Sequence, residues 1–142
     1  MNNENRETCK RIAKELDKIA DGTMYRCPEC GEWISDDDGT TYDEIHDTIT
    51  CNHCNAEFYY IDAEQISFLD YFGDCFNIEY RVNGNKEFKS VEIMVACGGP
   101  NIYVDTKSAV VRLHWWTDYA EYPISYGTRD AIDDAFNDLF NC

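Results

Sequence analysis

The sequence predicts an α+β fold with an N-terminal helix, a four-cysteine zinc ribbon and an antiparallel four-stranded sheet packed with helices. Three observations predict it. Apolar residues recur at helical spacing near both ends of the chain, 20 residues separate two identical Cys-x-x-Cys hooks, and the second half alternates apolar and polar residues between turn signals. With 44% hydrophobic and 14% aromatic residues, the 142-residue chain has enough apolar material for a core.

Residues 1–24 are predicted to form one amphipathic helix. In "RETCKRIAKELDKIADG" six residues share one face at helical spacing: Cys9, Ile12, Ala13, Leu16, Ile19 and Ala20. Gly22 follows them and is placed to end the helix.

Residues 25–61 are predicted to form the zinc-ribbon module, two hairpins held by a metal. The hooks "CPEC" and "CNHC" supply Cys27, Cys30, Cys51 and Cys54. Two such turns aim four sulfurs at one ion and complete a tetrahedron, so we expect one structural Zn²⁺. Four thiolates leave no coordination place for His53, which we expect to face solvent.

Residues 62–142 are predicted to form an α-β-β-β-β-α domain. Asp62 is placed to cap a helix at 63–72, and Thr128 to cap one at 129–140. Between them we expect strands at 75–82, 88–97, 101–106 and 109–116. Alternation assigns three groups to core faces: Phe76, Ile78, Tyr80 and Val82; their partners Val91, Ile93 and Val95; and Val111, Leu113 and Trp115.

Net charge restricts the class of partner. The chain carries 28 acids and 12 bases, a net charge of −16, and residues 25–62 contain ten acids against the single base Arg26. Zn²⁺ bound by four thiolates adds formal negative charge, so direct binding to a phosphate backbone is disfavoured. A basic protein surface is the expected partner.

The expected compartment is the cytoplasm, and the expected state is a monomer. We see no basic-then-apolar leader and no apolar run near the roughly 18 residues of a membrane span. Paired Cys-x-x-Cys hooks in a reducing compartment usually bind metal rather than form disulfides.

An enzyme is not expected. Cys97 in "ACGGPN" and His114 are the candidate catalytic groups, but neither has a partner at a spacing that indicates a base or an orienting acid. The acid-rich stretch "DDDGTTYDEIHD" departs from a Ca²⁺ loop because its glycine comes too early and its closing glutamate is missing.

Three groups of residues are candidates for contacts with a partner. Two are acidic: Asp36, Asp37 and Asp38 beside the first hook, and Asp130, Asp133, Asp134 and Asp138 on the C-terminal helix. The third is the aromatic group Trp116, Tyr119 and Tyr122 in "HWWTDYAEYPISY", because rings among acids suit a protein interface.

The chain resembles small phage or prophage proteins, in particular the zinc-containing anti-CRISPR inhibitors of the type II RNA-guided nuclease. The "GGPNIYVD" and "HWW" stretches carry this resemblance together with the hooks, over residues 25–142. It implies a phage-encoded protein of the host cytoplasm that binds the nuclease and prevents target DNA from loading. The alternative is a zinc-ribbon adaptor that docks on transcription or replication machinery.

Overall fold

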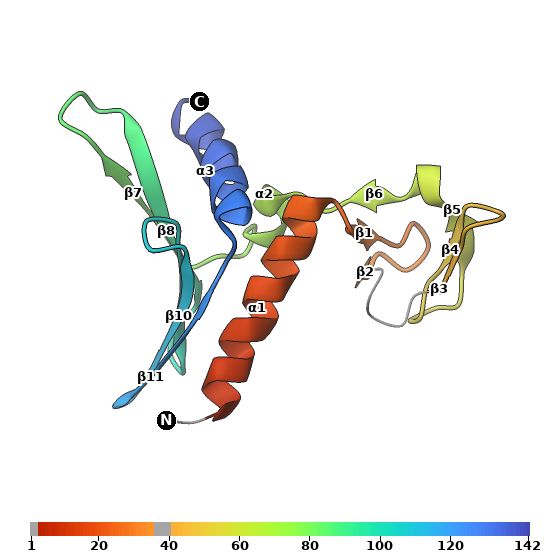
Figure 1. Ribbon diagram of the computed structural model, residues 1–142, viewed down its shortest axis with the longest axis horizontal. Helices are drawn as coiled ribbons and strands as arrows, with labels where there is room; N and C mark the ends of the chain where they lie inside the picture. The colour runs from red at the N-terminus through yellow and green to blue at the C-terminus, as the bar shows by residue number, and fades with distance from the viewer. Residues whose placement is uncertain (1–2, 36–40) are drawn as a thin grey trace.

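The computed structural model describes residues 3–35 and 41–142. Figure 1 shows a sheet with helices packed on one side of it, and a smaller part made mostly of short strands at the other end of the molecule. The helical segments are α1 (Asn3–Asp21), α2 (Phe68–Tyr71), α3 (Tyr126–Phe140) and the short 3-10 helix η1 (Tyr60–Asp62).

Helix α1 forms as its amphipathic pattern predicts. Its buried residues are Cys9, Ile12, Ala13, Leu16 and Ile19, whereas Ala20 is exposed. Gly22 adopts a φ of +73°, its N–H bonds the carbonyl of Ile19, and the N–H of Thr23 bonds that of Lys18. This pair of bonds is a Schellman motif, which ends the helix where a residue without a Cβ is available.

The large sheet has five strands, not the four that the sequence predicts. Its spatial order is β11-β10-β9-β8-β7, and all neighbours are antiparallel. Its strands are β7 (Asn77–Val82), β8 (Phe88–Ala96), β9 (Asn101–Asp105), β10 (Val110–Trp115) and β11 (Asp118–Pro123). The predicted pairing of β7 with β8 is confirmed, since Ile78 lies opposite Ile93 and Tyr80 opposite Val91.

The additional strand is β11, which pairs with β10 from Trp115 and Asp118 onward. Trp116, with a φ of +55°, lies in the tight turn between the strands. Ala120 is fully buried, and β11 packs against α1. The stretch interpreted as an aromatic loop is therefore an edge strand.

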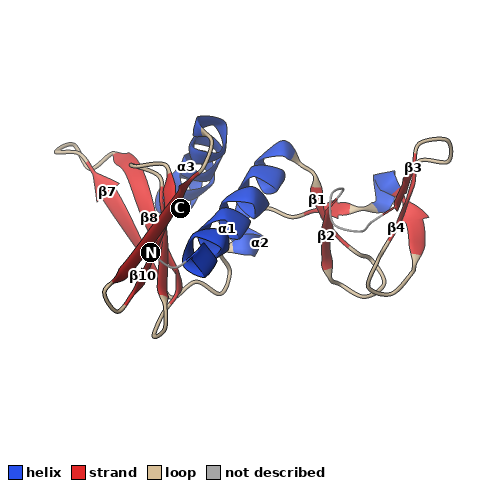
Figure 2. Ribbon diagram, turned by 60° about the horizontal axis from the view of Figure 1, so that its bottom comes forward, coloured by secondary structure: helices blue, strands red, loops and turns tan. Residues whose placement is uncertain are grey.

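Helices α1 and α3 cover the same face of the sheet, and no helix of the described residues lies over the other face (Figure 2). We call that uncovered side the outer face. Inward side chains of the sheet join α1 and α3 in the main core, among them Ile93, Val104, Val111, Leu113 and Phe136.

Three residues assigned to the core are exposed instead. Phe76 is 64%, Val82 47% and Trp115 38% exposed. Phe76 precedes β7, Val82 lies at a β-bulge that shifts the register, and Trp115 lies at the tip of its hairpin. Alternation fails at these positions because strand ends extend beyond the helices that cover the sheet centre.

The helix predicted at 63–72 is replaced by two shorter elements. Strand β6 (Glu64–Gln65) pairs with Tyr25 and Arg26, and α2 begins only after Ser67, whose side chain forms a capping box with Asp70. Strand pairing overrides the helical pattern here. Likewise Ser125, not Thr128, caps α3, and the Thr128 hydroxyl donates to Asp17 at 2.6 Å.

The smaller part, which we call the metal module, comprises the described residues 24–35 and 41–65. Two three-stranded sheets form it, in the orders β2-β1-β6 and β3-β4-β5. Its other strands are β1 (Met24–Arg26), β2 (Trp33–Ser35), β3 (Thr41–Asp43), β4 (Thr48–Thr50) and β5 (Glu57–Tyr59). Its buried cluster is small: Tyr25, Cys27, Ile34, Ile49 and Cys51.

Candidate metal centre

Two hairpin turns carry the four hook cysteines. The first joins β1 to β2, where the N–H of Cys27 bonds the carbonyl of Glu32 at 2.9 Å and that of Gly31 bonds the carbonyl of Cys27 at 2.9 Å. Gly31 has a φ of +76°, so the left-handed position after the hook is occupied by the residue that adopts it without strain.

The second turn, between β4 and β5, has the same two backbone hydrogen bonds as the first. The N–H of Cys51 bonds the carbonyl of Ala56 at 2.9 Å, and that of Asn55 bonds the carbonyl of Cys51 at 2.8 Å. Asn55 has a φ of +62°, and asparagine is among the few side chains that tolerate it. Equal spacing in the sequence thus gives two equal turns.

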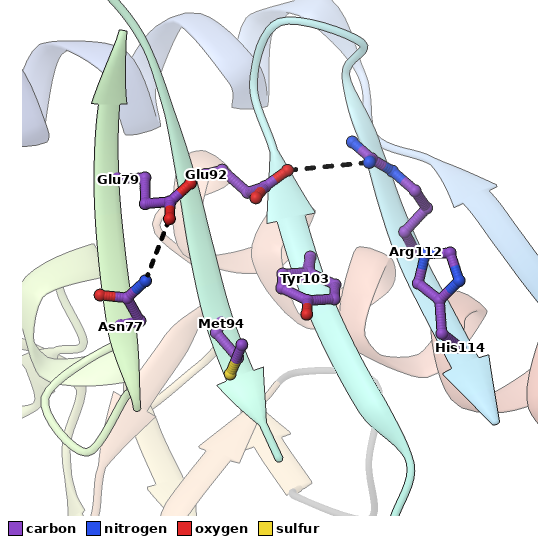
Figure 3. Close-up of a pocket in the computed structure, with 7 residues that line it drawn as sticks. All are labelled: Asn77, Glu79, Glu92, Met94, Tyr103, Arg112 and His114. Atoms are coloured by element: carbon purple, nitrogen blue, oxygen red, sulfur yellow. Dashed lines mark hydrogen bonds and ion pairs between the residues drawn. The ribbon is translucent and has the colours of Figure 1, made fainter. Parts of the chain in front are cut away.

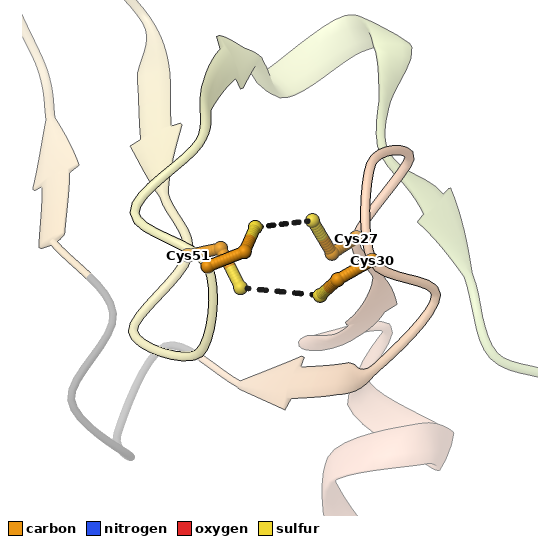
Figure 4. A group of neighbouring side chains, drawn as sticks. Cys27, Cys30 and Cys51 are labelled. Atoms are coloured by element: carbon orange, nitrogen blue, oxygen red, sulfur yellow. Dashed lines mark hydrogen bonds between the residues drawn. The ribbon is translucent and has the colours of Figure 1, made fainter.

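The four sulfurs converge on one point between the turns (Figure 4). The Sγ atoms of Cys27 and Cys54 are 3.7 Å apart, those of Cys30 and Cys51 are 3.8 Å apart, and all four lie within 4.8 Å of one another. A tetrahedral ion with metal–sulfur bonds of about 2.3 Å requires sulfurs about 3.8 Å apart, whereas a disulfide requires about 2.05 Å. The spacing is that of a metal site.

Backbone amides support the sulfurs. Burial alone would raise the pKa of Cys27, but N–H groups of Cys30 and Glu29 outweigh it and lower the pKa to about 7. The backbone N–H of His53 donates to the Cys51 sulfur at 3.4 Å. The thiolate is the metal-binding form of cysteine, so the N–H donors at Cys27 favour the protonation state that a cation needs there.

The four cysteines offer a complete set of donors for one tetrahedral ion. Cys27 and Cys51 are buried and belong to the core of the metal module, whereas Cys30 and Cys54 are exposed. His53 is exposed, as expected. Four protein ligands leave no place for a reacting water, and this is the donor set of structural rather than catalytic sites.

The acidic candidates fall in different places. Asp36, Asp37 and Asp38 lie outside the described residues. On α3, the residues Asp130, Asp134 and Asp138 are exposed, and we call them the α3 acidic face. Asp133 is half-buried, and burial raises the pKa of its carboxyl.

The aromatic candidates divide between the two sides of the sheet. Trp116 is 89% exposed at the hairpin tip, and Tyr119 lies on the outer face beside His114, with ring centroids 4.9 Å apart. Tyr122 lies on the helix side, where the cationic groups of Arg6 and Lys14 stand 5.0 and 5.9 Å from its ring centroid. Trp116 thus lies at the hairpin tip and Tyr119 on the outer face, whereas Tyr122 lies on the opposite side of the sheet.

Sequence reasoning did not identify the charged cluster at the centre of the outer face. The side chain of Asp105, 3% exposed, accepts hydrogen bonds from both Arg81 and Arg112. Glu92 lies 3.5 Å from Arg81 and 3.7 Å from Arg112. The signal was present, because all four residues occupy the outward positions of strands whose inward positions are apolar.

A shallow cavity of about 280 Å³ lies beside this cluster. Figure 3 shows its lining residues, Asn77, Glu79, Glu92, Met94, Tyr103, Arg112 and His114, on the outer face, with the helices behind the sheet. Cys97 is exposed at the end of β8 and is absent from this lining.

Comparisons with protein families, with curated proteins and with solved structures found no match to this chain. Among the described residues, none of the helices combines the length and apolar character that a membrane span needs.

Proposed function

We propose that the four cysteines bind one structural Zn²⁺ and that the metal module is a zinc ribbon. The sulfur separations of 3.7 and 3.8 Å support zinc, since they match a tetrahedral tetrathiolate site. Two of the five buried residues in the hydrophobic cluster of the module are themselves proposed ligands, so little apolar burial remains to hold it together without the ion.

We further propose that the zinc-stabilised chain binds a basic surface of a nucleic-acid-handling protein, and that it inhibits an RNA-guided nuclease by preventing target DNA from loading. The observation that carries this proposal is the exposed outer face of the sheet, with the 89% exposed Trp116 at one end of it. The chain around this surface has a net charge of −16. The identity of the nuclease rests on the resemblance given above.

Physical reasons favour a protein partner over a reaction or a nucleic acid. An exposed tryptophan held at a rigid turn provides a large contact area at small entropic cost, as interface hot spots do. The excess of acid repels phosphate backbones and attracts the basic channels in which such nucleases hold nucleic acid. Occupation of such a channel excludes DNA without any chemical step.

A DNA-loading experiment tests this function. Fluorescence anisotropy follows labelled target DNA as it binds guide-loaded type II nuclease, with the inhibitor added before or after the DNA. We expect strong loss of loading only when the inhibitor comes first. Unchanged loading at a large molar excess would reject the function, and capture of a polymerase or clamp from the host would favour the adaptor alternative.

Matched variants locate the contact. Trp116→Ala should weaken inhibition at least about tenfold, in the range of hot-spot truncations. Ile61→Ala, which removes an 86% exposed apolar side chain from the metal module, should have no effect. Equal losses in the two variants would show that Trp116 makes no specific contact.

A further inference from the structure

A second cavity, of about 450 Å³, lies at the rim of the five-stranded sheet beside the first turns of α3. We call it the rim pocket. It is distinct from the outer-face cavity and from the metal centre, because its lining shares no residue with either. Its volume is within the range of small-molecule sites.

The rim pocket concentrates positive charge on a strongly acidic chain. Residues 63–142 contain 13 acids and six bases, and four of those six bases line this one pocket: Arg81, Lys89, Lys107 and Arg129. Only two of the 13 acids, Asp130 and Asp133, accompany them. A gathering of like charges costs free energy unless opposite charges, from carboxylates of the protein or from a ligand, offset it.

The four cationic side chains differ in whether a carboxylate of the protein already pairs with them. Arg81 is held by Asp105, and the Nε of Arg129 donates to Asp130 at 2.9 Å. In the part of the chain that the structure describes, Lys89 and Lys107 are exposed and no carboxylate lies within ion-pair distance of their ammonium groups. The terminal nitrogens of Arg129 and the two ammonium groups are therefore the donors available to a ligand.

Asp133 supplies a hydrogen-bond acceptor beside these donors. Its Oδ1 is buried and has no hydrogen-bond partner among the described residues, although Asp133 lines the pocket with these cations. A buried acceptor without a partner is unfavourable, so a ligand hydroxyl that donates to it would stabilise the complex. Burial raises the pKa of Asp133, and the hydrogen bond from Thr106 and the charge of Arg129 oppose this rise.

We propose that the rim pocket binds a small phosphate ester that carries a hydroxyl group. The phosphate contacts Lys89, Lys107 and Arg129, and the hydroxyl donates to Asp133. Charge-assisted hydrogen bonds to three cations select a phosphate, and the acceptor beside them selects an ester with a free hydroxyl over inorganic phosphate. This site does not depend on the proposed function.

Titrations followed by NMR test the site, with inorganic phosphate, ribose 5-phosphate, ribose and a short single-stranded oligonucleotide as probes at constant ionic strength. Shifts should centre on residues 105–107 and 129–133. Ribose 5-phosphate should bind more tightly than inorganic phosphate, and ribose should not bind. Tighter binding of the oligonucleotide than of ribose 5-phosphate, or no shift with any probe at about 20 mM, would overturn the proposal.

Variants test the phosphate contacts and the hydroxyl contact separately. Lys89→Gln with Lys107→Gln should weaken binding of both phosphates at least about tenfold. Lys86→Gln, which removes an exposed cation outside the pocket, is the matched control and should leave both affinities unchanged. Asp133→Asn should tighten inorganic phosphate, because a negative charge is removed, and should reduce the preference for the sugar ester. Equal weakening by the control, or an unchanged preference in Asp133→Asn, would contradict the assignment.

Discussion

Gly99 and Trp115 form a close contact that shapes the tryptophan hairpin. A Cβ added at Gly99 would lie 2.5 Å from the Cζ3 of Trp115, closer than atoms can approach. Gly99→Ala should therefore displace Trp115. It should also displace Trp116, because the ring centroids of the two tryptophans are 5.9 Å apart. We expect a stability loss of about 1–3 kcal/mol in urea unfolding, as for other overpacked sites, together with a changed near-UV tryptophan signal.

Gly84 provides the control for that substitution. A Cβ at Gly84 meets nothing within 4 Å, so Gly84→Ala should leave both the stability and the tryptophan signal as they are. If Gly99→Ala behaves in the same way, the hairpin is not held against this loop.

Asp105 makes stability depend on pH in a defined direction. Burial alone would raise its pKa, but Arg81 and Arg112 outweigh burial and hold the pKa below the ordinary value. Because the folded pKa is the lower one, the contribution is complete above the unfolded value of about 3.9 and is lost as pH falls through the folded pKa. Unfolding midpoints measured from pH 7 to pH 2 should fall below about pH 4, and the fall should be smaller in Asp105→Asn than in the unmodified protein.

The same substitution should destabilise the protein at pH 7. Asp105→Asn leaves two guanidinium groups with a neutral acceptor, and we expect a cost of about 1–3 kcal/mol. Asp74→Asn removes an exposed carboxylate and should have no measurable effect. Equal stability of the two variants would mean that the ion cluster on the outer face contributes nothing.

At the scale of elements, the metal module and the sheet domain should separate when metal is removed. Their buried clusters are distinct, and the cluster around the sheet contains no hook cysteine. Chelation should therefore abolish amide protection in residues 24–35 and 41–65, while the amides of β8, β9 and β10 remain protected. Hydrogen exchange with and without chelator measures both regions at once.

Cysteine variants provide the control for that experiment. Cys27→Ser and Cys51→Ser should release the metal and reproduce the exchange of the chelated protein, whereas Cys142→Ser, at an exposed terminus, should retain the metal. If Cys51→Ser keeps both its metal and its protection, the four-sulfur assignment is wrong.

The elements also show which features the sequence predicts and which it does not. Each hook turn depends on six contiguous residues, so its shape follows from local chemistry at Gly31 and Asn55. Strand β11 was missed because tyrosines lie on both of its faces, Tyr119 outward and Tyr122 inward, and its one fully buried residue is the small Ala120. Without alternation, only pairing with β10 reveals the strand.

The two candidate sites also differ in whether the sequence predicts them. The four cysteines were predicted because metal ligation dictates residue type and spacing together. The rim pocket was not, because it joins residues from β7, β8, the β9–β10 turn and α3 that no short-range pattern connects.

At the scale of the whole molecule, net charge makes partner binding sensitive to salt. If acid steers the chain to a basic surface, the association rate should fall as salt rises and the Debye length shrinks below about 8 Å, while dissociation changes less. Asn substitutions at all three residues of the α3 acidic face should reduce this dependence if that face contacts the partner, and the fold should remain intact. Stopped-flow measurements of the association rate from low to high salt test this dependence. Association rates that do not change with salt would mean that the negative charge serves solubility and not partner binding.

Metal content tests the central claim of a zinc-folded chain most directly. Elemental analysis of gently purified protein, combined with native mass spectrometry, gives both the identity of the ion and its number per chain. The account predicts one Zn²⁺ for each 142-residue chain. Less than about half an equivalent of zinc, or a chain whose metal module stays folded without any ion, would contradict it.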